Sequence, residues 1–455
     1  MHSERTNKDR GARSSGRTAR LAVAVLVAAA LGPGARAEEA KAAGSGAGGG
    51  LESPQVSLGG QYRINTYSAE NDYPGQDSQT ASRVRVRQNV DLRFDDRFRT
   101  HVQLELGHTT SNVGTTDTRI GVRHAVLDYT SERRVNVQAG IVPLGDRFGD
   151  LLFSSDWNYN PVALALTAPL GPVTIRAFAG TLLESKADGA TVTGGEEVSA
   201  DDTTHYQLDV GLALGERVRL DAGGTFVQFS PDKIAPFRSR NHVNYGLGAR
   251  VNVARDLAVH AAVLGSRTES PIIAGNGDAR GVAAKLELTG KLGPVKFGLL
   301  GTHATGKDDG TGFLPVQAVA TTNGYWGYTG ILTVQGPTDT GFDGDSVNVS
   351  NNGYGMTTAQ VKLTAPVYGD LGAYAAAGWF GNSGGVGRSG DVGTDFLLMA
   401  TYRFNRVLAL DVGGGYARIE DSASGYEAGP SGGFRQAAGT SRTKTAVVAR
   451  VQAEF

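Results

Sequence analysis

The last ten residues of the chain, 446–455, read AVVARVQAEF. The odd-numbered positions hold only apolar side chains, at Val447, Ala449, Val451, Ala453 and Phe455. The even-numbered positions are mostly polar, with Arg450, Gln452 and Glu454. Because successive side chains of a β-strand point to opposite faces, the stretch predicts a strand with one apolar and one polar face. Chain ends usually fray, so a soluble domain rarely ends on a buried aromatic residue.

The same alternation recurs along most of the chain. Its clearest instance is 82–94, SRVRVRQNVDLRF, where Val and Leu alternate with Arg, Asn and Asp. Between residues 56 and 455 the pattern predicts about eighteen strands, with sixteen and twenty as limits, because a further hairpin could lie within 305–354. Connections after even-numbered strands are short and turn-like, whereas those after odd-numbered strands are mostly long and polar. This asymmetry predicts short turns on one side of a membrane and long loops on the other.

These features together resemble Gram-negative outer-membrane β-barrel porins. The resemblance implies an all-β fold, a transmembrane antiparallel up-and-down barrel with short periplasmic turns and long extracellular loops. A closed sheet is the β-structure that pairs every backbone amide in hydrocarbon, so closure is expected on physical grounds as well. The resemblance also implies that Phe455 serves as the terminal assembly signal.

The first 37 residues predict a cleaved signal peptide. Basic residues precede an apolar run at 21–31, and Ala35-Arg36-Ala37 is a small-residue cleavage site. Residues 38–55 are rich in Gly and Ala and predict a flexible periplasmic lead-in, followed by the barrel at 56–455. The apolar run is too short for a permanent membrane helix. We therefore expect export and a location in the outer membrane.

Composition excludes several classes of protein. With residues 1–37 removed, 37 basic and 43 acidic residues remain, a net charge of −6, which argues against a nucleic-acid surface. The chain has no Cys, and hence no disulfide, thiolate metal site or Cys-x-x-Cys-His haem attachment. Its 65 glycines follow no three-residue period, which excludes collagen. After the signal region no apolar run approaches the length of a membrane helix.

The polar parity of the predicted strands is rich in cations. Fifteen basic side chains face eight acidic ones, although the exported chain is net acidic. Rings of Arg and Lys favour anions in pores, so the pattern predicts a weak anion preference. The residues predicted to line the pore are Arg63, Arg83, Arg85, Arg87, Arg93, Arg176, Arg219, Arg250, Lys296, Arg403 and Arg450. The same parity also carries Lys285, Lys362, Arg442 and Lys444, against Asp91, Glu105, Asp209, Asp221, Glu287, Asp395, Asp411 and Glu454.

Within that set, the ladder Arg83-Arg85-Arg87 is the sharpest feature, and two interpretations of it stay open. It is either an anion-attracting ladder or an ordinary wall paired with Asp91 and Glu105.

One connection is predicted to narrow the channel. Residues 140–150, GIVPLGDRFGD, followed by Asp156-Trp157-Asn158, are similar to a strand-to-loop passage in porins of the alginate-export and phosphate-selective kind. In such porins the loop after an early strand often folds inward. The resemblance implies constriction residues at Asp146, Arg147, Asp150 and Trp157, while an exposed cap is the alternative.

No motif for catalysis or metal binding stands out. The acidic loop at 339–352 lacks the closing Glu of a calcium loop, so we expect a hydrophilic extracellular loop there. The histidines are scattered over different strands, with no pair at metal-ligand spacing. No Gly-x-Ser-x-Gly elbow and no phosphate-binding loop is visible, so we expect no enzyme activity and no cofactor.

The sequence therefore predicts a passive porin for small hydrophilic or anionic solutes. Expected partners are outer-membrane lipid and the barrel assembly machinery, with a homotrimer left open and nucleic acid excluded. A second hypothesis is a sleeve for a partner protein, such as a multihaem cytochrome conduit or a periplasmic lipoprotein. The third is an outer-membrane lipase or protease.

Overall fold

The structure is a computed structural model, and it describes residues 54–71, 79–111, 116–155, 159–181, 204–228, 241–269, 278–308, 310–316, 327–333, 348–351, 353–384, 391–420 and 442–455. The predicted signal peptide, nearly all of the lead-in and Trp157 lie outside these ranges. So does most of the acidic stretch at 339–352.

Eighteen strands form within the described residues, the number expected from the alternating pattern. They are β1 (Gln55–Asn71), β2 (Gln79–Arg93), β3 (Phe98–Ser111), β4 (Thr116–Thr130), β5 (Asn136–Ile141), β6 (Val162–Leu170), β7 (Val173–Thr181), β8 (Thr204–Leu214), β9 (Val218–Gln228), β10 (Asn241–Ala254), β11 (Leu257–Thr268), β12 (Ala279–Leu292), β13 (Val295–Ala304), β14 (Met356–Tyr368), β15 (Leu371–Asn382), β16 (Asp391–Arg403), β17 (Leu408–Ile419) and β18 (Arg442–Glu454).

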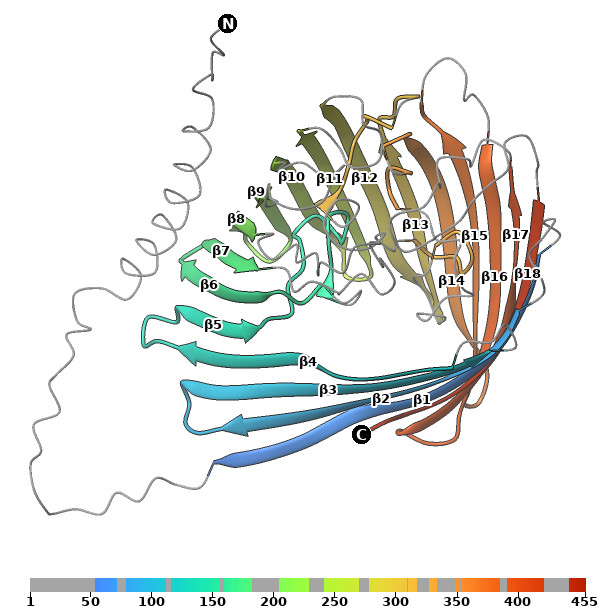
Figure 1. Cartoon of the computed structure of the whole chain (residues 1–455), viewed down its shortest axis with the longest axis horizontal. Coiled ribbons are helices and arrows are strands. Elements are labelled where there is room, and N and C mark those ends of the chain that lie inside the picture. The colour runs from blue at the N-terminus through green and yellow to red at the C-terminus, as the bar shows by residue number, and fades with distance from the viewer. Residues whose placement is uncertain are drawn as a thin grey trace, which may run out of the picture.

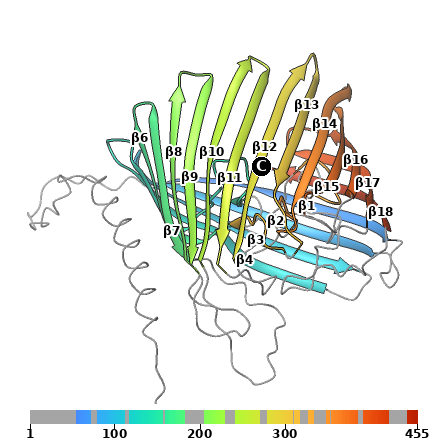
Figure 2. The same cartoon turned by 90° about the horizontal axis from the view of Figure 1, so that it is seen from above.

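The sheet closes on itself. Each strand pairs with its neighbour in sequence, and β1 also pairs antiparallel with β18, with Gln61 opposite Glu454. Figure 1 shows β1 in blue beside β18 in red, and Figure 2 shows the ring of strands turned by 90°. The chain end takes part in the closure, because the Gly60 N–H donates to the Phe455 carbonyl at 2.7 Å and the Phe455 N–H donates back at 3.1 Å. The predicted antiparallel up-and-down barrel is confirmed.

The two faces of the closing strand follow the alternation in the sequence. Val447 and Phe455 are each 61% exposed, whereas Val448 and Arg450 are buried against the interior. The same division recurs around the barrel, where Leu58, Leu247 and Leu398 are among many large apolar residues exposed on the outside. A water-soluble monomer rarely exposes so much apolar surface. A closed sheet with an apolar outer belt is the architecture of a membrane-spanning barrel.

Short turns join the strands at one end of the barrel. In the turn from β2 to β3, the Asp95 carboxylate accepts the N–H groups of Arg97 and Phe98, both at 2.7 Å. In the turn from β16 to β17, Asn405 Oδ1 accepts the N–H groups of Val407 and Leu408, both at 2.8 Å. Asp and Asn favour such turns because their side chains bond the backbone two or three residues ahead.

The connections at the other end are mostly longer. The connection at 112–115, between β3 and β4, is a short one at that end. Two of these connections supply much of the buried apolar surface inside the barrel: Phe148, Leu152 and Phe153 from 142–161, and Phe313, Ile331 and Leu332 from 305–355. Within the described ranges, the structure holds no helix of the length and apolarity that a membrane crossing requires.

Candidate functional site

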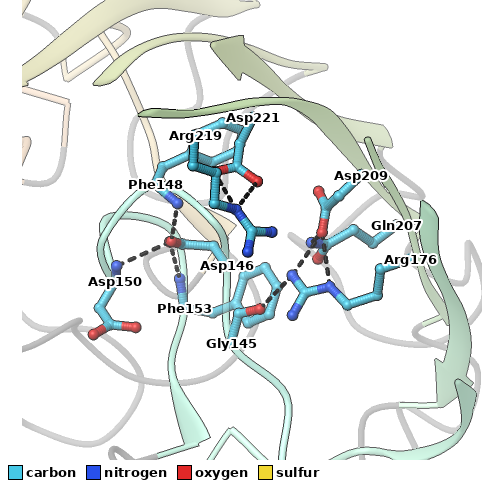
Figure 3. A network of polar contacts seen from close by, with 10 residues as sticks. All are labelled: Gly145, Asp146, Phe148, Asp150, Phe153, Arg176, Gln207, Asp209, Arg219 and Asp221. Atoms are coloured by element: carbon cyan, nitrogen blue, oxygen red, sulfur yellow. Dashed lines mark hydrogen bonds and ion pairs between the residues drawn. The ribbon is translucent and has the colours of Figure 1, made fainter. Parts of the chain in front are cut away.

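The β5–β6 loop, residues 142–161, turns into the barrel and is organised around one of its own carboxylates (Figure 3). Asp146 Oδ1 accepts the N–H groups of Phe148 at 2.7 Å and Asp150 at 2.9 Å, and Oδ2 accepts those of Leu152 at 2.6 Å and Phe153 at 3.4 Å. Burial raises the pKa of Asp146, and the N–H groups of Leu152, Phe148 and Asp150 oppose that rise. Both oxygens therefore face the loop backbone, and Asp146 holds the loop in a compact turn.

Aromatic packing fixes this loop against the wall. The Phe153 ring lies 4.6 Å from the Tyr159 ring, 6.1 Å from Phe178 of β7 and 5.1 Å from His205 of β8, measured between centroids. The Gly145 carbonyl accepts a hydrogen bond from Arg176 Nη2 at 2.7 Å, and Arg176 also binds Asp209 (Figure 3). These contacts attach the base of the loop to β7 and β8.

The tip of the β5–β6 loop reaches β11 and β12, well round the wall from its base. Lys285 of β12 donates from Nζ to the Gly149 carbonyl at 3.0 Å. A Cβ added to Gly149 would lie 2.6 Å from both Lys285 Nζ and His260 Cε1, and the Gly149 φ of 83° is in the left-handed region. Gly149 is therefore required both by the backbone conformation and by the close approach. The loop as a whole extends across the interior.

Two further constriction candidates lie near this tip. Asp150, at φ 60°, lines the cavity described below. Burial lowers the pKa of Arg147, and the nearby cations Arg176 and Arg219 act in the same direction. The predicted inward loop thus brings Asp146, Arg147 and Asp150 together, each in a different environment.

The β13–β14 loop, residues 305–355, also enters the barrel. Its segment 327–333 lies against the inner wall, where the Tyr328 N–H donates to Gln360 Oε1 at 2.7 Å and the Tyr374 hydroxyl donates to the Tyr328 carbonyl at 2.6 Å. A second segment of this loop contacts β10 and β11. There Asn244 Nδ2 donates to the Leu314 carbonyl at 3.0 Å, and the Leu314 N–H donates to Ser266 Oγ at 3.1 Å.

The sequence predicts a hydrophilic extracellular loop in the last part of this connection. The described residues there are buried, which an exposed loop would not be. Asn348, Val349, Ser350 and Asn351 are all buried. Asn348 Oδ1 accepts the N–H of Ser350 at 3.0 Å and its hydroxyl at 2.9 Å, so this part is folded around its own polar groups. No group of three or more potential metal ligands occurs among the residues that the structure describes.

The two loops meet at a cavity of about 800 Å³ that is also lined by β10, β11, β12, β14 and β15. Gly149 and Asp150 line it from the β5–β6 loop, and Gly327 and Tyr328 line it from the β13–β14 loop. The strands contribute three cations, two aromatic or imidazole rings and one carboxylate: Arg250, Lys285, Lys362, His260, Tyr374 and Glu287. Cations thus outnumber carboxylates around the narrowed interior.

A single polar chain joins both loops to β12. Lys285 Nζ lies 3.1 Å from Glu287 Oε2 while it also donates to the Gly149 carbonyl of the first loop. The Tyr328 hydroxyl of the second loop donates to Glu287 Oε1 at 2.5 Å. Lys362 Nζ stands 3.9 Å from the centroid of the Tyr328 ring, within the range of a cation–π contact.

The cavity continues towards the short turns. A second hollow of about 530 Å³ shares Lys362 and Tyr374 with the first and is also lined by Lys296. It extends to Arg255, Asp256 and Lys291 in and beside the turns of that end. Basic side chains therefore line both hollows, from the two inward loops to the end of the barrel that carries the short turns.

The predicted pore-lining residues divide between this site and the rest of the wall. Arg250 and Lys296 line the two hollows. Arg176 pairs with Asp209, Arg219 with Asp221 and Arg450 with Asp411. Arg63 Nη2 donates to Gln452 Oε1 at 3.2 Å. Arg93 pairs with Asp96 in a turn, and Arg403 is exposed at the end of β16.

The Arg83-Arg85-Arg87 ladder lies on β2, away from both hollows. Arg87 Nε lies 2.5 Å from Glu105 Oε2, the pairing that the wall interpretation anticipated. Arg85 donates to Gln61 Oε1 at 2.7 Å, and Arg83 donates to the Tyr67 hydroxyl at 3.4 Å. None of the three lines either hollow among the described residues.

Sequence reasoning did not single out Tyr328, Tyr374 or His260. Tyr374 has the inward parity of β15, but an isolated inward Tyr gives no indication of a site. Tyr328 belongs to 324–330, GYWGYTG, whose dense aromatic residues are unusual for a hydrophilic loop and were the available signal.

Comparison with known proteins identifies the fold. No protein-family model matches the sequence. No curated protein matches it either. Among solved structures, Pseudomonas aeruginosa OccK5 (OpdH) is 11% identical and superposes with a TM-score of 0.53 over 88% of this chain and 98% of that one. P. aeruginosa OprD is 12% identical, with a TM-score of 0.52 over 89% and 98%. The outer membrane protein opdK of P. aeruginosa is 11% identical, with a TM-score of 0.52 over 88% and 99%. The chain therefore has the closed β-barrel fold of these Pseudomonas proteins.

Proposed function

We propose that this protein is an outer-membrane porin, a passive channel for small hydrophilic solutes with a weak preference for anions. The observation that carries the proposal is the cavity between the two inward loops, where Arg250, Lys285 and Lys362 converge. A closed barrel with an apolar belt explains the membrane location, and its polar interior supplies a route for water and solutes. No reaction is assigned to the chain.

Selection would act through width and charge. The two loops narrow the interior, so large solutes are excluded sterically. Cations around the cavity lower the energy of a passing anion, whereas Asp150 and Glu287 oppose this effect locally. Water in the lumen screens charges over about 8 Å at physiological salt, so we expect a preference and no strict filter.

Because of the position of the cavity, we place the centre of anion selectivity there and not at the Arg83-Arg85-Arg87 ladder. We assign the main contribution to Arg250, Lys285 and Lys362, with Lys296 as a further cation towards the rim. Arg83, Arg85 and Arg87 contribute less in this proposal, because Arg87 is paired with Glu105 and the ladder lies on another part of the wall. The remaining predicted lining residues contribute through the general field of the lumen.

The inward loops favour a channel over a sleeve for a partner protein. A partner inside the barrel would need the space that the β5–β6 and β13–β14 loops occupy around Phe153 and Tyr328. We retain Phe455 as a proposed assembly residue, since its side chain is exposed on the outer surface beside β1. Lipid and the barrel assembly machinery are the partners that this proposal implies.

Reversal potentials in planar bilayers test the proposal. With purified protein under a salt gradient, we expect stable conductance and a potential of the sign that anion selectivity produces. A potential of the opposite sign would contradict the anion preference while leaving the channel intact. Complete absence of conductance in protein that shows the heat-modifiable gel migration of a folded barrel would contradict the channel itself.

A further inference from the structure

We propose that Asp395 is a positioning residue that holds segment 327–333 inside the barrel and thereby sets the shape of the cavity. This inference deepens the proposed function and rests on it. Asp395 does not line the cavity itself, and it acts through the backbone of the β13–β14 loop.

Asp395 binds the backbone of the loop through Oδ2. It lies on β16 with its side chain fully buried, and its Oδ2 accepts the N–H of Ile331 at 2.8 Å and the N–H of Leu332 at 2.6 Å. Hydrogen bonds to an ionised carboxylate are stronger than neutral ones. The Thr329 hydroxyl and the N–H groups of Ile331 and Leu332, all from the same loop segment, offset the burial of this side chain.

The rest of the attachment comes from the two preceding strands. Gln360 of β14 is opposite Gly378 of β15, and Gly378 is opposite Asp395. Gln360 and Asp395 thus lie in one row on either side of a residue without a side chain, and both face the loop. A Cβ on Gly378 would lie 3.1 Å from Gln360 Cγ and 2.8 Å from Phe380 Cε2, so the row has no room for a larger residue.

Tyr328 transmits this attachment to the cavity. Its N–H and carbonyl are bound by Gln360 and Tyr374, and Asp395 fixes the backbone three and four residues further on. The Tyr328 ring then lies beside Lys362, with its hydroxyl on Glu287. Removing the Asp395 carboxylate should release the segment, withdraw the ring and leave a wider passage.

Single-channel recording of Asp395→Ala tests the inference. We expect higher conductance than wild type and a reversal potential closer to zero, because ions then pass farther from the cavity cations. Asp395→Asn retains an oxygen that accepts the two N–H groups and should restore most of the wild-type behaviour. Tyr374→Phe, which removes one hydroxyl, should change conductance in the same direction by less.

Asp411→Ala is the matched control. Asp411 is equally buried on the neighbouring β17, but it binds Arg450 and Thr401 of the wall. In variants that assemble, as judged by heat-modifiable migration, Asp411→Ala or the milder Asp411→Asn should retain wild-type conductance. Wild-type conductance and ion preference in a folded Asp395→Ala barrel would overturn the inference.

Thiol labelling separates this inference from the channel proposal. The chain has no Cys, so Leu332→Cys introduces a unique thiol at a buried position. Loss of two charge-assisted bonds should accelerate maleimide labelling by about tenfold or more when Asp395→Ala is added. Equal labelling rates in the two backgrounds would overturn the inference even if the wild type fails to conduct.

Discussion

The two inward loops are held in place by opposite means. The β5–β6 loop carries its own organising carboxylate, Asp146, whose backbone partners lie two to seven residues away. The segment 327–333 of the β13–β14 loop is held instead by Gln360, Tyr374 and Asp395 on three adjacent strands. The first loop is a local structure that docks on the wall, whereas the second segment depends on the wall for its conformation.

Asp146→Ala should give the largest effect, because it removes the centre of a self-organised loop. Each lost bond to the carboxylate is worth about 1.5–3 kcal/mol. Four main-chain N–H groups lose their acceptor together, so we expect the loop to unfold and conductance to rise more than in any other single variant. Single-channel conductance is the measurement.

Asp95→Ala is its control. This carboxylate also accepts two backbone N–H groups, but it does so in the exposed turn between β2 and β3. Its loss should leave conductance unchanged. If both variants change conductance equally, the effect of Asp146→Ala is general destabilisation and says nothing about the loop.

Lys285 and Glu287 connect the two loops, and their substitutions should act in opposite directions. Lys285→Met removes a cavity cation and the bond to the Gly149 carbonyl, so anion preference should fall. Glu287→Gln removes the opposing negative charge at nearly constant size, so anion preference should rise. Reversal potentials that shift in the same direction in both variants would contradict an electrostatic role for the cavity.

The smallest effect is expected from the ladder on β2. Replacing Arg83, Arg85 and Arg87 together by Gln should shift the reversal potential less than Arg250→Gln alone, since Arg250 lines the cavity and the ladder does not. Salt screening limits the reach of the ladder to about 8 Å. A larger shift in the triple variant would return the centre of selectivity to β2.

The sequence identified the β5–β6 loop because its organisation is local. GIVPLGDRFGD contains both the acceptor, Asp146, and its nearest partners, so the stretch could be singled out from the sequence, although the inward turn was only implied by resemblance, with an exposed cap as the alternative. The contact between the loop tip and the wall could not be predicted from the sequence, because Lys285 and Gly149 are 136 residues apart. Their contact depends on how the six intervening strands, β6 to β11, curve between them.

The sequence alone determined the barrel, a strand number close to eighteen and the inward or outward direction of side chains such as Val447 and Arg450. These properties follow from a period of two residues and from the need to pair every amide within a membrane. Only the tertiary structure decided which inward cations meet. The pairing of β10 to β14 and the inward fold of the β13–β14 loop bring Arg250, Lys285 and Lys362 to the same cavity as Tyr328. Arg83, Arg85 and Arg87 lie on another part of the wall, although their alternating pattern was the clearest in the chain.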